Sequence, residues 1–364
     1  MNRNKRGKWI VLLAVVGTVL GSAGRATAQT APKTHELKLA PESVTWGPIT
    51  GNTKPVLKIA SGDTVTVETE GDSVMNYLKF AGVPDSEIPA SLRDLQAYGE
   101  AHGFTGSPTT GPIYIEGAEP GDTLAIHFIK FEFLHPYGWT QITPGRGTLP
   151  DEFPLYKLKI LHYNTEARTV EFAPGINLKL APFWGVTQVA PPLAPRAVQE
   201  TSPGPLGGNM DDKDLTAGST LYLPVQVPGA LLSFSDSHAL QGDGEISISA
   251  SETSLRGTVQ VSVQKGKRIL WPRAETPTHY MTMGIDPDLN EATRMAVREM
   301  LDFLVNEKGM SREDAYMLCS LAVDLHVTEF VDNPKGVRAM VAKSIFSKSS
   351  TMLPNGRTTE MSRK

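Results

Sequence analysis

The stretch from residue 207 to residue 245 constrains the fold most, because one apolar segment there separates two acid-rich segments. The apolar segment Ser219–Val227 predicts a strand, and Pro228-Gly229 after it predicts a turn. Leu231–Phe234 is apolar enough to be a returning strand. We therefore expect a hairpin whose open end brings the two acid-rich segments together. The first of these segments contains Asn209, Asp211, Asp212 and Asp214.

The second acid-rich segment surrounds one histidine with carboxylates. His238 lies two residues after Asp236 and seven residues before Glu245. Two glycines in this segment allow a backbone path that brings Asp243 and Glu245 around one point. One histidine with several close carboxylates is the donor set of a hard or borderline divalent cation. The simpler alternative is that His238 and Asp243 only stabilise a turn.

Short alternating segments predict a mainly β fold with a β-sandwich-like core. Gly (33 residues) and Pro (27 residues) are frequent, which suits short strands and turns more than a helical bundle. The period-two pattern predicts strands at residues 44–46, 55–60, 63–69, 113–116, 123–133, 155–163, 169–172, 176–180, 245–250, 257–264, 268–271 and 279–285. The segments 55–60 and 63–69 predict either a hairpin or two successive strands.

A short motif recurs before several of these predicted strands. Gly-Asp-Thr and an apolar residue occur at Gly62–Val65 and at Gly121–Leu124, and Gly218–Leu221 repeats the motif with Ser in place of Asp. Each copy is a turn that leads into a strand. The repetition favours an internal duplication within the sandwich.

The hydrophobic period changes near the C-terminus, where we expect a helix pair. Asp288–Asn306 predicts a helix that stops before Gly309, and Ser311 begins a second helix that runs to about Thr328. A final strand is predicted at Val337–Val341.

We expect two subdomains between two terminal segments. The N-terminal β subdomain covers residues 29–205 and ends in a Pro-rich link; within it, residues 84–98 predict a short helix and residues 135–150 a loop. The C-terminal β subdomain with the helix pair covers residues 206–345. Residues 346–364 predict a disordered tail.

Residues 1–28 predict a cleavable signal peptide. A basic start precedes the apolar Trp9–Leu20, and Ala26-Thr27-Ala28 is a small-residue cleavage signal. An uncleaved anchor is the alternative. Cleavage after Ala28 would export the protein to the periplasm or the medium, without stable membrane association. It would also remove five basic residues and change the net charge from −4 to −9, which argues against binding to nucleic acid.

The single cysteine excludes some kinds of chemistry. One Cys allows neither an intrachain disulfide nor a cysteine-based zinc site. Cys319 lies on an apolar helical pattern, so we expect it in a core and not as a nucleophile. The sequence contains neither a G-x-S-x-G elbow nor a Gly-Ser-rich nucleophile loop.

Two long motifs resemble those of the acetamidase/formamidase family of metal-dependent amide hydrolases. The first is TGPIYIEGAEPGDT at 110–123. The second comprises GGNMD at 207–211, LTAGSTLYLPV at 215–225 and SDSHALQGDGE at 235–245. The resemblance extends over roughly residues 37–336. It implies hydrolysis of a small aliphatic amide of the formamide or acetamide type, with release of ammonia and a carboxylate.

The resemblance also suggests roles for individual residues. It implies that Asp211, His238 and Glu245 are metal ligands, and that Asp236 orients a ligand or acts as a base. Further catalytic candidates are Asp243 and also Glu116, which lies in the first long motif. The remaining acids of the first segment, Asp212 and Asp214, are expected to be solvated.

We expect a divalent metal, with zinc favoured and calcium as a second, structural ion. The metal would polarise the amide carbonyl and activate a water. A homo-oligomer is also expected. Two alternatives stay open: a non-catalytic periplasmic binding or scaffold protein on the same fold, or a metal-dependent hydrolase of another C–N bond or of an ester.

Overall fold

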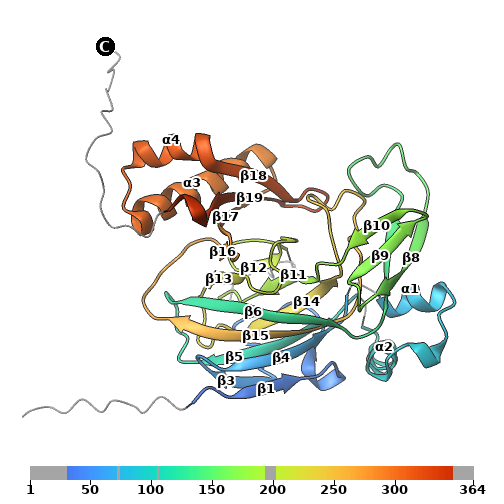
Figure 1. Ribbon diagram of the computed structural model, residues 1–364. Coiled ribbons are helices and arrows are strands. Elements are labelled where there is room, and N and C mark those ends of the chain that lie inside the picture. The colour runs from blue at the N-terminus through green and yellow to red at the C-terminus, as the bar shows by residue number, and fades with distance from the viewer. Residues whose placement is uncertain (1–30, 72–73, 105, 193–201, 347–364) are drawn as a thin grey trace, which may run out of the picture. The chain divides into compact units, whose positions relative to one another are not determined.

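Strands predominate over helices in the computed structural model, which describes residues 31–71, 74–104, 106–192 and 202–346 (Figure 1). Within these residues the strands form three sheets. The largest has nine strands in the order β1 (Thr34–Leu37), β4 (Thr64–Thr69), β15 (Leu255–Gln264), β6 (Thr123–Phe133), β13 (Thr220–Pro224), β16 (Arg273–Glu275), β17 (His279–Asp286), β19 (Lys335–Ala342) and β18 (Val323–Glu329).

A second, six-stranded sheet contains the strands that will carry the candidate site. Its order is β12 (Gly207–Asn209), β11 (Phe183–Gln188), β14 (Leu232–His238), β5 (Thr109–Glu116) and β2 (Val44–Thr45), and β3 (Leu57–Ala60) pairs with β5. A four-stranded sheet has the order β10 (Ile176–Lys179), β9 (Thr169–Ala173), β8 (Lys157–Asn164) and β7 (Tyr137–Ile142).

The main hydrophobic core contains apolar residues from the two larger sheets. Val65 and Val67 of β4 and Ile126 of β6 belong to the same buried cluster as Ile113 of β5 and Phe234 of β14. These side chains recur at alternate positions of their strands, as expected where one face of a strand is buried. The predicted mainly β fold with a sandwich-like core is therefore confirmed.

The recurring Gly-Asp-Thr motif forms the same turn twice. The Asp63 carboxylate accepts a hydrogen bond from the Ala60 backbone N–H at 3.0 Å, and the Asp122 carboxylate accepts one from the Glu119 N–H at 2.9 Å. The first turn joins β3 to β4 and the second joins β5 to β6, so each passes the chain from the six-stranded to the nine-stranded sheet. The two predicted strands at 57–69 are therefore successive strands and not a hairpin.

Two C-terminal helices are present, as predicted. The Asp288 side chain caps α3 (Leu289–Lys308), and Gly309 ends it in the left-handed conformation with φ 71°. This helix packs on β17 and β19. Gly284 of β17 allows the close approach, because a Cβ there would meet the backbone of Ala292 and Ala296. The second helix, α4 (Arg312–Ala322), packs on α3 and is followed directly by β18.

The expected hairpin after residue 219 is wrong. β13 lies in the nine-stranded sheet and β14 in the six-stranded sheet, so the two strands do not pair. Ala230 and Leu231 have positive φ angles of 56° and 57° where the chain passes between the sheets. The chain does reverse, but it reverses between layers instead of within one sheet.

Several local expectations also fail. The expected loop at 135–150 contains β7, and the Pro-rich region contains β11. Gly138 of β7 is needed for packing, because a Cβ there would clash with the Tyr163 hydroxyl. Residues 245–250 form a loop, the strand expected at 268–271 lies at Arg273–Glu275, and α4 ends at Ala322 because β18 begins there. The short helix expected at 84–98 corresponds to α2 (Ala90–His102), while α1 (Val74–Phe80) was not expected.

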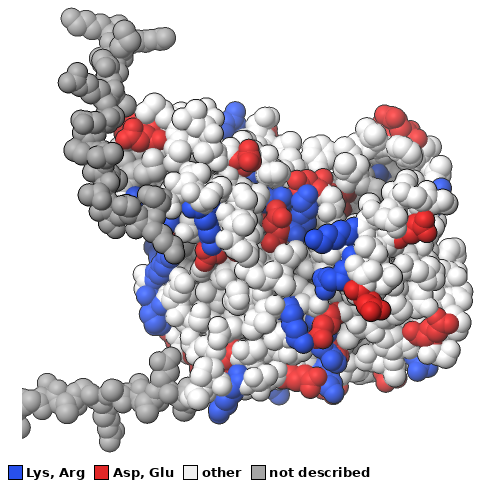
Figure 2. All heavy atoms as spheres, viewed as in Figure 1, with Lys and Arg blue, Asp and Glu red and all other residues white. Residues whose placement is uncertain are grey.

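Some expectations stay predictions. The signal peptide, residues 193–201 of the Pro-rich region and the tail from residue 347 lie outside the described residues. Strands from both sides of residue 205 share the two larger sheets, and the subdomain boundary stays a prediction. Within the described residues, no helix has the length and apolar character needed to cross a membrane. On the face shown in Figure 2, acidic and basic side chains are interspersed.

Candidate metal centre

Three neighbouring strands of the six-stranded sheet place the candidate residues. Asp211 follows β12, and Gly185 lies in β11. Asp236 and His238 lie at the C-terminal end of β14. β11 pairs with both β12 and β14, so it sits between the two acid-rich segments. Residues far apart in the sequence thus meet without the predicted hairpin.

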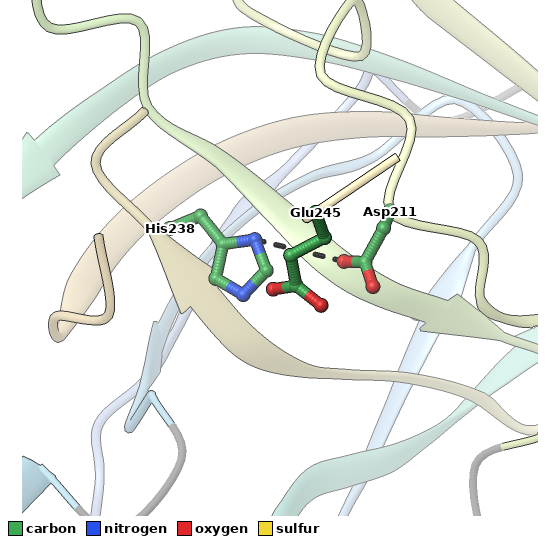
Figure 3. A group of neighbouring side chains, drawn as sticks. All are labelled: Asp211, His238 and Glu245. Carbon is green, nitrogen blue, oxygen red and sulfur yellow. Dashed lines mark ion pairs between the residues drawn. The ribbon is translucent and has the colours of Figure 1, made fainter. Parts of the chain in front are cut away.

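Asp211, His238 and Glu245 gather around one point (Figure 3). Each offers one ligand atom, and these atoms lie within 4.8 Å of one another. The His238 Nδ1 atom is 3.6 Å from the Asp211 Oδ1 atom. All three residues are buried. The predicted ligand set is therefore assembled in the structure.

A second group shares the same histidine. The His238 Nε2 atom lies 3.2 Å from the Asp236 Oδ1 atom and 3.2 Å from the Glu252 Oε2 atom. These three residues also form a set of ligand atoms within 4.8 Å of one another. Each nitrogen of the ring thus faces a different set of carboxylates.

The backbone is unusual at the acidic residues of the cluster. Asp211, Asp236 and Glu245 have φ angles of 46°, 57° and 46°, a region that non-glycine residues seldom occupy. Such conformations cost of order 1–3 kcal/mol each and occur preferentially at functional sites. Their presence at three neighbouring carboxylates indicates that the surrounding fold imposes their positions.

Gly185 provides the room for this arrangement. A Cβ at Gly185 would lie 2.6 Å from Asp236 Oδ2 and 3.0 Å from His238 Cε1, and it would clash with Asp211 Oδ1. The Gly185 carbonyl also accepts a hydrogen bond from the Asp211 backbone N–H at 3.3 Å. Any larger residue at this position would push the cluster apart.

Burial and charge repulsion raise the pKa values of the acids of the cluster. Burial, followed by the nearby Glu245 carboxylate, raises the pKa of Asp211 well above its ordinary value. Burial likewise raises the pKa of Glu245, against the opposing effect of His238. Burial is also the main cause of the raised pKa of Glu329, a fully buried neighbour.

The pKa of the histidine is also raised, which favours its charged form. Burial disfavours the charged imidazolium, but the carboxylates of Glu252 and Asp236 outweigh burial and raise the pKa of His238 well above its ordinary value. In the metal-free protein the imidazolium therefore supplies positive charge within an acidic cluster. Ligation through one ring nitrogen requires that nitrogen to lose its proton, so metal binding would release a proton.

The donor set fits a divalent cation. Asp211, Asp236, Glu245, Glu252 and Glu329 bring five carboxyl groups close to one imidazole. The buried Asp211 Oδ1 atom receives no hydrogen bond from the described part of the chain. Buried charges persist in proteins when they are paired or bind metals, and a cation would relieve the repulsion that raises the carboxyl pKa values.

Amide side chains fix the orientation of the ligands. Gln241 donates through Nε2 to the Asp211 carbonyl at 3.1 Å. Its Oε1 atom lies 2.9 Å from His238 Nδ1, a contact that metal ligation through Nδ1 would replace. Asn209 donates to the Asp211 carboxylate at 3.0 Å and to the Asp332 carboxylate at 3.1 Å. Such outer partners hold metal ligands in place and tune their basicity.

The structure corrects one expectation about the acids. Asp212 was expected to be solvated, but it is fully buried and forms a 2.9 Å ion pair with the buried Arg338. Asp214, whose side chain is partly exposed, also pairs with Arg338. The side chains of Asp211 and Asp212 therefore enter two different ionic networks.

Two catalytic candidates are not brought into the cluster. Asp243 contacts Arg338, His326 and Lys213, and although burial opposes the change, Arg338 and then His326 lower the pKa of Asp243. Glu116, at the end of β5, forms an ion pair with Lys58 and has a half-exposed side chain. Cys319 is buried in the cluster formed by α3, α4 and β19, as expected.

Sequence reasoning missed three residues of the site. Gly185 lies in a stretch assigned to the Pro-rich link. Glu252 belongs to a loop in the structure, and its place beside His238 depends on an isolated bridge between the two residues. Glu329 follows a segment expected to be helical. Their positions depend on pairings between distant segments, which local patterns do not encode.

A cavity of about 430 Å³ opens beside the cluster. Its lining includes Asp236, Glu245 and Glu252, together with Trp139 and Arg146. The carboxylates at the inner end of the cavity are thus accessible to a small molecule.

The fold and the site define a β-sandwich protein with a buried carboxylate–imidazole centre beside a polar cavity. The model of the Acetamidase/Formamidase family matches residues 54–194 and 192–348, and the chain belongs to this family. An acetamidase structure from Bacillus halodurans is 33% identical with a TM-score of 0.70, covering 86% of this chain and 100% of that one.

Curated relatives are more distant. A formamidase from Methylophilus methylotrophus is 26% identical, over 62% of this chain and 73% of that protein. A putative formamidase from Schizosaccharomyces pombe is 24% identical, over 55% of this chain and 61% of that protein. The chain thus matches less than two thirds of the length of the yeast protein.

Proposed function

We propose that the protein hydrolyses small aliphatic amides of the formamide or acetamide type, with release of ammonia and a carboxylate. One observation carries the proposal: the buried Asp211–His238–Glu245 group adjoins a cavity that Asp236 and Glu245 also line. The names of the relatives, formamidase and acetamidase, support an amide substrate. An amide carbonyl is a poor electrophile, so its hydrolysis needs strong polarisation.

The residues divide into ligands and a proton carrier. Asp211, His238 and Glu245 would hold the divalent cation, which would supply Lewis-acid polarisation of the carbonyl and acidify a water. Asp236 lines the cavity and its side chain is one-fifth exposed, so it can accept a proton from water and return it to the leaving amine. Glu252 lies against His238 Nε2 and orients the ring.

The imidazole in the first group favours zinc. A second, structural ion such as calcium would need oxygen donors, and the cluster provides further carboxylates for it. Elemental analysis of the purified protein decides the identity and number of the ions.

The test measures ammonia release from formamide, acetamide and longer amides, with and without a chelator. We expect turnover that the chelator abolishes and added metal restores. His238→Ala should lose both metal and turnover while its circular dichroism spectrum stays native. His127→Ala, at an exposed position of β6, is the matched control and should retain both.

The outcomes separate the alternatives. A His238→Ala protein that keeps its metal and its turnover would overturn the site. A wild-type protein that binds metal but releases no ammonia from any amide would instead favour the binding or scaffold protein. Ester or lactam turnover without amide turnover would favour a hydrolase of another bond.

We further propose export with cleavage after Ala28, and a homo-oligomer. The signal-like sequence of residues 1–28 supports export. Exposed apolar side chains at Tyr316 and Leu321 of α4 and at Leu325 of the adjacent edge strand β18 support self-association. Light scattering of the wild type and of Leu321→Asp would test the oligomer.

A further inference from the structure

Glu245, a candidate ligand, lies in the loop between β14 and β15, where no strand fixes the backbone. Gly242 and Gly244 come shortly before it, and glycine leaves the backbone freer than any other residue. Glu245 itself has a φ angle of 46°, a conformation that persists only where the surrounding structure imposes it. The loop therefore needs an anchor close to Glu245.

Asp243 provides that anchor two residues before Glu245. Its Oδ1 atom lies 2.9 Å from Nη2 of Arg338, and its Oδ2 atom lies 3.0 Å from Nδ1 of His326. The backbone of Gly244 supports the same attachment, because its N–H donates to the Thr328 carbonyl at 3.2 Å. These three partners belong to β18 and β19, so the loop is fixed to the C-terminal strands.

The same guanidinium holds the segment that carries a second candidate ligand. Nη1 of Arg338 lies 2.9 Å from Oδ1 of Asp212, and both side chains are buried. Asp212 directly follows Asp211, whose carboxylate belongs to the ligand group and whose φ angle is also 46°. One arginine thus contacts the chain neighbours of two candidate ligands that are far apart in the sequence.

Arg338 is well suited to keep these two segments at a fixed separation. It lies on β19, which pairs with a strand on each side, and it stands opposite Met283 of β17 and His326 of β18. The guanidinium is a rigid planar fork, whereas the ammonium of lysine is a single charge on a flexible stem. Neither bound carboxylate can therefore shift without losing a charge-assisted contact.

We propose that Arg338, Asp212 and Asp243 form a clamp that sets the separation of Asp211 and Glu245, and that these three are positioning residues of the metal centre. The clamp acts on the ligands through the backbone, and none of its three residues lines the cavity. This inference rests on the proposed function, because it assigns Asp211 and Glu245 to the cation. It adds that the ligand geometry is imposed from the nine-stranded sheet.

The test uses a carboxylate that shares the guanidinium but leaves the clamp intact. Asp214 lies 2.7 Å from Nη2 of Arg338, and its side chain is 35% exposed, against 30% for Asp243. Asp243→Ala and Asp214→Ala therefore each remove one negative charge and one contact to the same nitrogen. Only Asp243→Ala frees a ligand segment, because Asp212 still holds the other segment in Asp214→Ala.

Metal affinity is measured by competition between the full chain and a chelator for Zn²⁺. We expect Asp243→Ala to lower the affinity about tenfold, the lower end for residues that hold metal ligands in place. Asp214→Ala should stay within about twofold of the wild type, as expected for one partly exposed pair. Asp243→Asn keeps an oxygen that can accept from Arg338, so it should recover most of the affinity. Equal losses in Asp243→Ala and Asp214→Ala, or in Asp243→Ala and Asp243→Asn, would show an effect of charge alone and overturn the clamp.

Hydrogen exchange of the full chain in the presence of a chelator tests the clamp without a metal. The Gly244 and Ile248 amides donate to the carbonyls of Thr328 and Glu245. They should exchange about tenfold faster in Asp243→Ala than in the wild type, and at the wild-type rate in Asp214→Ala. If the wild type binds no Zn²⁺, the proposed metal centre fails, and exchange alone decides the clamp. Unchanged exchange in Asp243→Ala would refute it in either case.

Discussion

Arg338 is the residue whose removal should affect the fold most, because it neutralises three carboxylates from two loops. Its guanidinium, 1% exposed, lies 2.9 Å from Asp212, 2.7 Å from Asp214 and 2.9 Å from Asp243. Asp212 is itself fully buried. Burial raises the pKa of Asp212 and Arg338 opposes that rise, so Arg338 favours the charged form of the carboxylate.

Arg338→Met keeps an unbranched apolar side chain but leaves buried carboxylates without their cation. Removing one partner of a buried ion pair costs about 3–5 kcal/mol. We expect a loss of this size in the free energy of unfolding near pH 8, measured by urea denaturation. The loss should shrink at lower pH, where Asp212 can take up a proton instead. Adding Asp212→Asn to Arg338→Met should recover part of the stability.

The matched control is Lys213→Met. Lys213 also pairs with Asp243, at 3.2 Å, but its side chain is one-third exposed. Partly exposed pairs contribute about 0–1 kcal/mol, so the control should change stability little. A loss below about 1 kcal/mol for Arg338→Met, or a loss equal to that of Lys213→Met, would refute the reasoning.

Four further predictions concern other parts of the chain. Gly185→Ala should lower metal affinity at least about tenfold, measured by chelator competition, because of the clash described above; Gly242→Ala, where a Cβ meets nothing within 4 Å, should not. Burial lowers the pKa of His135 to about 4 from an ordinary 6.5, so its stabilisation is complete above pH 6.5 and declines towards pH 4. Wild type should therefore lose up to about 3 kcal/mol over that range that His135→Leu does not lose, and parallel losses would contradict this. Burial raises the pKa of Cys319, so alkylation should be slow in the folded protein and Cys319→Ser should keep activity; inactivation of a folded Cys319→Ser protein would argue for a thiol nucleophile. Sequencing of protein from its native host should begin near Gln29, and a sole form that starts at Met1 would contradict export.

Patterns with a local cause could be predicted from the sequence. The strand period, the caps of α3 and the Gly-Asp-Thr turns each depend on neighbours within a few residues, and the structure confirms them. The grouping of the three candidate ligands could be predicted in part for a similar reason. His238 and Glu245 lie seven residues apart, and the family resemblance pointed to Asp211 with them.

Features set by distant contacts could not be predicted. Whether β13 pairs with β14 depends on which sheet each strand joins, and Ser219–Val227 contains no local sign of that choice. Asp212 was predicted to be solvated because its partner, Arg338, is 126 residues away in the sequence. Because Asp212 is buried against Arg338, Asp212→Ala is expected to destabilise the protein.

The left-handed backbone at Asp211, Asp236 and Glu245 has a consequence for how the family can change over time. Crowded carboxylates on a strained backbone lower stability in the absence of a cation, so many substitutions there would make the metal-free protein more stable. Glycine at Glu245, for example, would relieve both the conformational strain and the charge repulsion. Such substitutions would therefore raise the stability of the metal-free protein and remove the proposed metal centre. Under the proposed function, these acids serve chemistry at the expense of stability.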